Sequence, residues 1–113
     1  MAADYTQEKL WQAVQHLIGP GSIQRRLEAA AGYIIRLQGG DAAFDEPDLQ
    51  RQVDMLIQEL TKTPARGDEG TIAATTRMLT DQDGAKIAEE IFELFCRATD
   101  RATVPVGFEP RPT

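Results

Sequence analysis

The 113-residue chain has little of the chemistry on which metal sites and many active sites depend. It contains one cysteine, Cys96, and one histidine, His16, so an intramolecular disulfide and a metal site built on several histidines are excluded. No apolar run approaches the length of a membrane span, and the N-terminus lacks a basic region followed by an apolar core. We therefore expect a cytoplasmic protein that needs no metal or cofactor.

The chain also lacks the excess of positive charge that is typical of nucleic-acid-binding proteins. It has 18 acidic and 12 basic residues, which gives a formal net charge of −6. An acidic surface repels phosphates, so binding to nucleic acid is disfavoured. The same surface is compatible with a basic partner protein.

Helical periodicity dominates what is present, and no segment alternates as a half-buried strand would. The stretch 85–98 is the most apolar run that keeps a helical period. One face of this helix consists of Ala88, Ile91, Phe92 and Phe95. The residues that widen this face are Ile87, Leu94 and Ala98. A stripe this broad indicates a central helix that packs against more than one neighbour.

Capping residues and helix breakers divide the chain into four main helices and one short helix, so we predict an all-α bundle. The expected helices begin after Asp4, after Ser22, near Pro47, between Asp68 and Thr71, and after Thr80. The second should reach Gln38 and the last Arg101. We assign residues 1–102 to this domain and residues 103–113, which contain three prolines, to an extended C-terminal tail.

The third helix has the clearest amphipathic pattern, with apolar residues at Leu49, Val53, Leu56, Ile57 and Leu60. In the second helix, the small residues 29–32 would let another backbone approach closely. We expect the most buried side chains to include Leu27, Ile34, Leu56, Leu60, Ile91 and Phe95.

A glycine-containing turn precedes the second helix and is followed by two arginines. Free N–H groups at a helix N-terminus and guanidinium groups both bind anions, so Ser22, Arg25 and Arg26 form a candidate anion site. The turn lacks the Lys-Ser/Thr ending of a P-loop. An ordinary turn with a serine cap and two solvated arginines is the simpler interpretation.

Asp81, Asp83 and Glu90 are spaced in part like the ligands of a calcium loop. Leu79 would then occupy the first ligand position, which needs a carboxylate, and Lys86 a position that is usually apolar. Capping of the last helix explains the aspartates more simply, so we predict no specific metal.

No catalytic set is assembled in the sequence, which favours a non-catalytic protein–protein interaction module such as an adaptor, inhibitor or small regulatory subunit. Its candidate partner surface is acidic and consists of Asp45, Glu46, Asp48, Asp54 and Glu59. The alternative is a small enzyme or an anion- or ligand-binding domain with a site between helices near Ser22, Arg25 and Arg26. Its further candidates are Trp11, His16 and Tyr33.

Self-association as a homodimer is also expected, because a chain of this size covers only part of its last helix. The predicted contact is the flank formed by Ile87, Leu94 and Ala98, or the small residues 29–32. In the competing hypothesis, the tail covers the same flank and leaves a monomer. The tail residues concerned are Val104, Val106 and Phe108.

Overall fold

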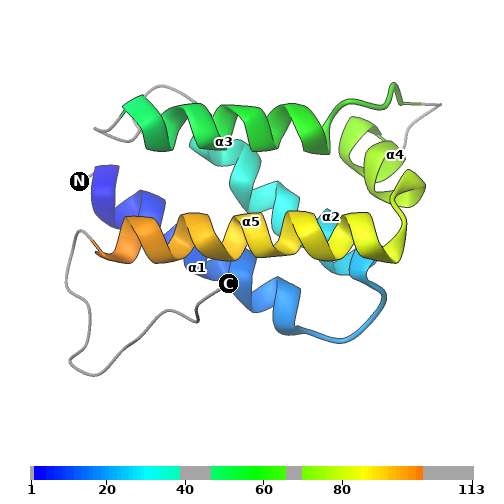
Figure 1. Ribbon diagram of the computed structural model, residues 1–113, viewed down its shortest axis with the longest axis horizontal. Coiled ribbons are helices and arrows are strands. Elements are labelled where there is room, and N and C mark those ends of the chain that lie inside the picture. The colour runs from blue at the N-terminus through cyan, green and yellow to red at the C-terminus, as the bar shows by residue number, and fades with distance from the viewer. Residues whose placement is uncertain (1, 39–46, 66–69, 101–113) are drawn as a thin grey trace.

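The computed structural model describes residues 2–38, 47–65 and 70–100, and every regular element in these ranges is a helix. The elements are α1 (Ala2–Ile18), α2 (Ile23–Ile34), the short 3-10 helix η1 (Ile35–Leu37), α3 (Pro47–Leu60), α4 (Gly70–Met78) and α5 (Asp81–Asp100) (Figure 1). The predicted all-α class is therefore confirmed. No helix in these ranges is both long enough and apolar enough to cross a membrane. The tail 103–113 lies outside the described residues.

Two of the predicted N-caps are confirmed. The backbone N–H of Arg25 donates to Ser22 Oγ at 3.2 Å, and that of Asp83 donates to Thr80 Oγ1 at 3.0 Å. These hydroxyls satisfy N–H groups that have no partner within their own helix. In the turn between α1 and α2, Gly21 adopts φ +103°, a value that residues with a Cβ rarely reach.

Two predicted helix boundaries differ from the structure. The first helix begins at Ala2, so Asp4 lies within its first turn and not at its cap. The second ends at Ile34, and the chain tightens into η1 before it reaches Gln38. Helix ends commonly tighten in this way, because bonds to the third residue satisfy carbonyls that the last α-helical turn leaves free.

α5 has the several neighbours expected of a central helix, since it packs against α1, α2 and α3. Figure 1 shows it running across the front of the molecule, with α3 along one side. α1 is antiparallel to α5: Gln7 Nε2 donates to Thr99 Oγ1 at 3.5 Å, and the Trp11 and Phe95 ring centroids are 5.6 Å apart. α2 is equally central, because it contacts α1, α3, α4 and α5.

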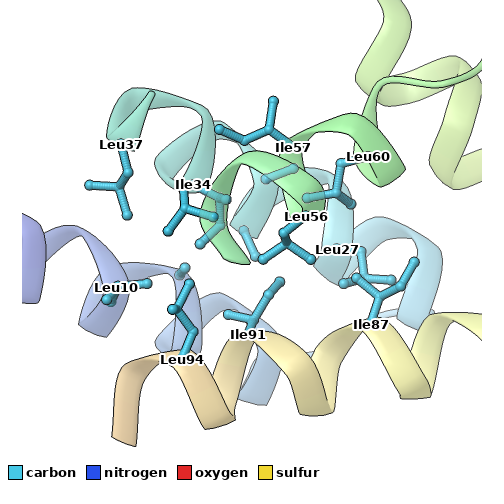
Figure 2. Packing of buried hydrophobic residues seen from close by; sticks show 14 of the residues in the cluster. Leu10, Leu27, Ile34, Leu37, Leu56, Ile57, Leu60, Ile87, Ile91 and Leu94 are labelled. Carbon is cyan, nitrogen blue, oxygen red and sulfur yellow. The ribbon is translucent and has the colours of Figure 1, made fainter. Parts of the chain in front are cut away.

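The buried core lies where α1, α2, α3 and α5 meet (Figure 2). All five apolar positions predicted for the third helix are buried, and Leu27, Ile34 and Ile91 are fully buried. Phe95 was expected among the most buried side chains, and this is wrong: it is only partly buried and packs at the edge of the core.

α5 is rotated by less than a quarter turn from the predicted orientation. Its buried stripe consists of Gly84, Ile87, Ile91 and Leu94. Phe92, which was predicted at the centre of the apolar face, is 49% exposed. The reason is the close approach of α2: a Cβ at Gly84 would lie 3.0 Å from Ile23 Cγ1 and 3.3 Å from Leu27 Cδ1. The small residue that admits this crossing is therefore on α5.

Candidate functional site

The residues of the predicted anion site make contacts within the chain. Ser22 caps α2, and the guanidinium of Arg26 donates to Leu17 O at 2.8 Å and to Gly21 O at 3.1 Å. Arg26 therefore satisfies a carbonyl at the C-terminal end of α1. Arg25 is exposed. These contacts favour the simpler interpretation, a turn that one arginine ties to the preceding helix.

The described acidic residues of the predicted partner surface lie on the exposed side of α3. Each has a polar partner nearby in the sequence: Asp48–Arg51 (3.4 Å), Glu59–Lys62 (3.3 Å) and Gln50 Nε2 to Asp54 Oδ1 (3.1 Å). Two of the three carboxylates are thus next to a cation. The positive charge of that cation weakens the negative potential that a partner protein would meet at this surface. Asp45 and Glu46 lie outside the described residues.

The predicted dimer flank has little apolar surface to offer. Ile87 and Leu94 are only 6% and 1% exposed within the single chain, and Ala98 is partly buried against the same core. This flank is therefore disfavoured as a contact, because the rotation of α5 turns these side chains inward. The alternative contact, the small residues 29–32, stays a prediction. Dimerisation itself stays a prediction.

Trp11 and His16 lie on opposite flanks of α1, so the structure does not gather the predicted pocket residues around one site. Trp11 packs on Phe95 of α5. His16 stacks on Tyr33 of α2, with ring centroids 5.2 Å apart and planes inclined by 23°. A cavity walled by all three aromatic side chains would need them on one flank.

Where α1 packs against α2 and η1, two cations, Lys9 of α1 and Arg36 of η1, lie over aromatic rings. Lys9 Nζ lies 5.3 Å from the centre of the Tyr5 ring and 5.8 Å from that of Tyr33, and Arg36 Cζ lies 5.9 Å from Tyr33. At exposed sites such contacts stabilise a protein by about 0.5–1 kcal/mol each. Packing between α1 and α2 therefore accounts for this cluster without a ligand.

The opposite flank of α1 leaves large apolar side chains exposed next to one another. Trp11 is 46% exposed although its ring packs on Phe95, and Phe92, three residues before Phe95, is 49% exposed. Ile18 lies two turns after Trp11 on the same side of α1 and is 74% exposed. We call these four residues, Trp11, Ile18, Phe92 and Phe95, the α1–α5 face. Large contiguous apolar patches at a surface often mark contact sites for other molecules, which makes this face the candidate site.

The charged side chains next to the α1–α5 face are acidic in the described part of the chain. Glu8 lies one turn before Trp11 on α1. On α5, Glu89 lies one turn before Phe92. Both glutamates are exposed, so the apolar face has a negative border.

The cations of α5 are directed toward its other flank, which faces α3. Arg97 donates a hydrogen bond to Gln52 of α3. Lys86 is near enough to Glu90 for its charge to lower the pKa of that carboxyl. Arg97 is therefore directed away from the α1–α5 face.

Two titratable groups on α5 have pKa values that burial shifts. Desolvation is the main cause that raises the pKa of Glu90; the charge of Glu59 raises it further, Lys86 opposes the shift, and Glu93 adds to it. Desolvation, followed by the charge of Glu93, also raises the pKa of the Cys96 thiol. A raised thiol pKa means less thiolate, which is the opposite of an activated nucleophile.

Glu90→Gln should stabilise the protein slightly near neutral pH. A carboxyl whose pKa is raised by folding destabilises the native state as pH rises through that pKa, and the penalty is absent below the unfolded-state pKa. Because Glu90 is only partly buried, we expect a gain of about 0.5 kcal/mol or less at about pH 7 and none at about pH 3. Urea unfolding at both pH values measures this. Glu89→Gln, an exposed substitution with the same charge change, is the control, and an equal gain there would contradict the assignment.

Two aspartates of the partial calcium motif form hydrogen bonds within the chain at the start of α5. Gln24 Nε2 donates to Asp81 Oδ1 at 2.9 Å, and the N–H of Asp83 binds the cap Thr80. In residues 2–38, 47–65 and 70–100, no three His, Cys, Asp or Glu side chains are grouped so that they could hold a metal ion.

No protein-family model matches the chain, and no curated protein or solved structure is significantly similar to it. Any function must therefore be argued from the surfaces described above, among which the α1–α5 face is the one that packing within the described residues does not explain.

Proposed function

We propose that this chain is a non-catalytic protein–protein interaction module, such as an adaptor, inhibitor or small regulatory subunit, and that it contacts its partner through the α1–α5 face. The observation that supports this is the half-exposed state of Trp11 and Phe92 on neighbouring helices. Tryptophan and other aromatic residues are enriched at the centres of interfaces, where they bury a large apolar area. Burial of this area on binding would offset the cost of leaving it in water in the free chain.

The proposal includes the finer features that the sequence suggests. The module acts in the cytoplasm, and its helices form one bundle in which α4 is the short member. Self-association would use the small residues 29–32, since the flank of Ile87 and Leu94 is buried. The alternative, an anion-binding domain or small enzyme near Ser22 and Arg25, has less support because Arg26 already binds carbonyls of its own chain.

Capture of partners with matched variants tests the proposal. Phe92→Ser removes an exposed aromatic ring from the α1–α5 face, and Met55→Ser removes a 59% exposed apolar side chain from α3. We expect a partner captured by the wild-type chain in its native host to be lost with Phe92→Ser and retained with Met55→Ser. Circular dichroism should show that both variants stay folded. Equal capture by all three chains would contradict the proposed surface.

A further inference from the structure

We propose that the α1–α5 face binds an amphipathic basic helix, with apolar residues on one side and Lys or Arg residues along the borders of that side. This inference rests on the proposed function and adds the chemistry of the partner. It is carried by two properties of the face: the spacing of its apolar side chains and the sign of the charges around it.

The spacing of the face suits a helix laid alongside α1 and α5. Trp11 and Ile18 are seven residues apart on α1, which corresponds to about 10 Å along the helix axis. A partner helix presents its residues i, i+3, i+4 and i+7 over the same length. Phe92 and Phe95 supply the second row of contacts on α5, antiparallel to the first. Two antiparallel helices with exposed apolar residues on adjoining sides provide a surface against which a third helix packs.

The charges around the face select a basic partner. Glu8 borders it on α1 and Glu89 borders it on α5, while Arg97 is hydrogen-bonded to α3. The whole chain has a formal net charge of −6, which adds a long-range attraction for cations. Lysine or arginine residues on the borders of the partner's apolar side would therefore face glutamates, which speeds association and excludes acidic competitors.

The same charges disfavour two other occupants of the face. In a symmetric dimer, the acidic borders of two copies would lie near one another, and like charges in an interface cost affinity. The chain's own tail has Val104, Val106 and Phe108 but also three prolines, and from this sequence we expect an extended segment and not the helix that the spacing fits. Both occupants are outcomes that the experiment below distinguishes.

Fluorescence of Trp11 measures occupancy of the face directly, because it is the only tryptophan in the chain. The probes are two synthetic peptides of 15 residues without tryptophan. In both, leucines are placed at i, i+3, i+4, i+7, i+8 and i+11; the remaining positions are lysine in one and glutamate in the other. The full-length chain is titrated with each. We expect the lysine peptide to shift the Trp11 emission to shorter wavelength in a saturable way, with an affinity that falls as salt rises. The glutamate peptide should cause no shift.

Matched variants show whether the peptide binds at the proposed place. Phe92→Ser should weaken binding of the lysine peptide by at least tenfold, and Met55→Ser should leave it unchanged. An equal affinity for wild type and Phe92→Ser would overturn the inference, because the peptide would then bind elsewhere on the acidic surface. An emission shift of the same size and affinity with the glutamate peptide would also overturn it. The glutamates around the face would then not discriminate between a basic and an acidic peptide.

The remaining outcomes identify the competing occupants, and each overturns the inference. Trp11 emission that depends on protein concentration without peptide indicates a second copy on the face. Emission that moves to longer wavelength when Val104, Val106 and Phe108 are all replaced with serine in the full-length chain indicates that the tail covers it. A native partner that is captured through Phe92 but presents no basic helix would refute the inference and leave the proposed function standing.

Discussion

Ile91→Ala should lower the free energy of unfolding by about 2–5 kcal/mol. Ile91 is completely buried and lies in the middle of α5, where the core of α1, α2, α3 and α5 meets. Truncation removes three carbons from contact with the core and leaves a cavity that the helices around it fill only in part. Urea unfolding followed by circular dichroism measures the change.

The neighbouring substitution Phe92→Ala is the control for this prediction. Phe92 is 49% exposed, so its truncation removes a larger side chain but opens no cavity in the core. We expect a loss below about 1 kcal/mol. The opposite order, with Phe92→Ala the more damaging of the two, would show that α5 is rotated toward the orientation in which Phe92 is central.

Gly84→Leu should destabilise the protein by about 1–3 kcal/mol, although leucine favours helices more than glycine does. A Cβ at this position would already lie 3.0 Å from Ile23 Cγ1 and 3.1 Å from Ile23 Cγ2. The further carbons of leucine would therefore push α2 away from α5 and disturb the packing of Leu27. The melting temperature should fall accordingly.

Gly32→Ala separates this steric effect from the general effect of replacing a helical glycine. Gly32 is exposed on α2, and a Cβ there would meet nothing within 4 Å. Alanine has fewer backbone conformations than glycine in the unfolded chain, and it favours the helix. We therefore expect the free energy of unfolding to rise by about 0.5–1 kcal/mol. Stabilisation by both substitutions would contradict the close approach of α2 and α5 at Gly84.

The sequence was sufficient to predict elements whose apolar residues form a single narrow stripe. In α3, Leu49, Val53 and Leu56 lie on one line of the helix surface, so only one orientation buries them, and all are buried. Ser22 and Thr80 were also predicted correctly as caps, because hydroxyl capping depends only on residues nearby in the chain.

The orientation of α5 was not predictable in the same way, because its apolar stripe is wider than the area that the other helices cover. Periodicity alone cannot choose between a buried face centred on Phe92 and one centred on Ile91. The choice depends on Gly84, whose missing side chain admits α2 close to the start of α5. The sequence alone does not show which glycine in a helix allows a neighbouring helix to approach closely.

The α1–α5 face could not be predicted for a related reason. It exists only because the antiparallel register of α1 and α5 brings Trp11 beside Phe95 and leaves Phe92 next to them. Phe92 and Phe95 lie 81 and 84 positions after Trp11 in the chain, and no local pattern links them to it. The available signal was that Trp11 lies beside the main stripe of its helix, where an exposed tryptophan is unusual.

The proposed interaction surface is tested best by quantitative capture from the native host with three full-length chains: wild type, Phe92→Ser and Met55→Ser. The ratio of each captured protein between the variants and wild type is measured by mass spectrometry. For the partner, we predict a ratio near one with Met55→Ser and a loss of at least tenfold with Phe92→Ser. If every protein captured by wild type is recovered equally with Phe92→Ser, the α1–α5 face is not where this chain binds.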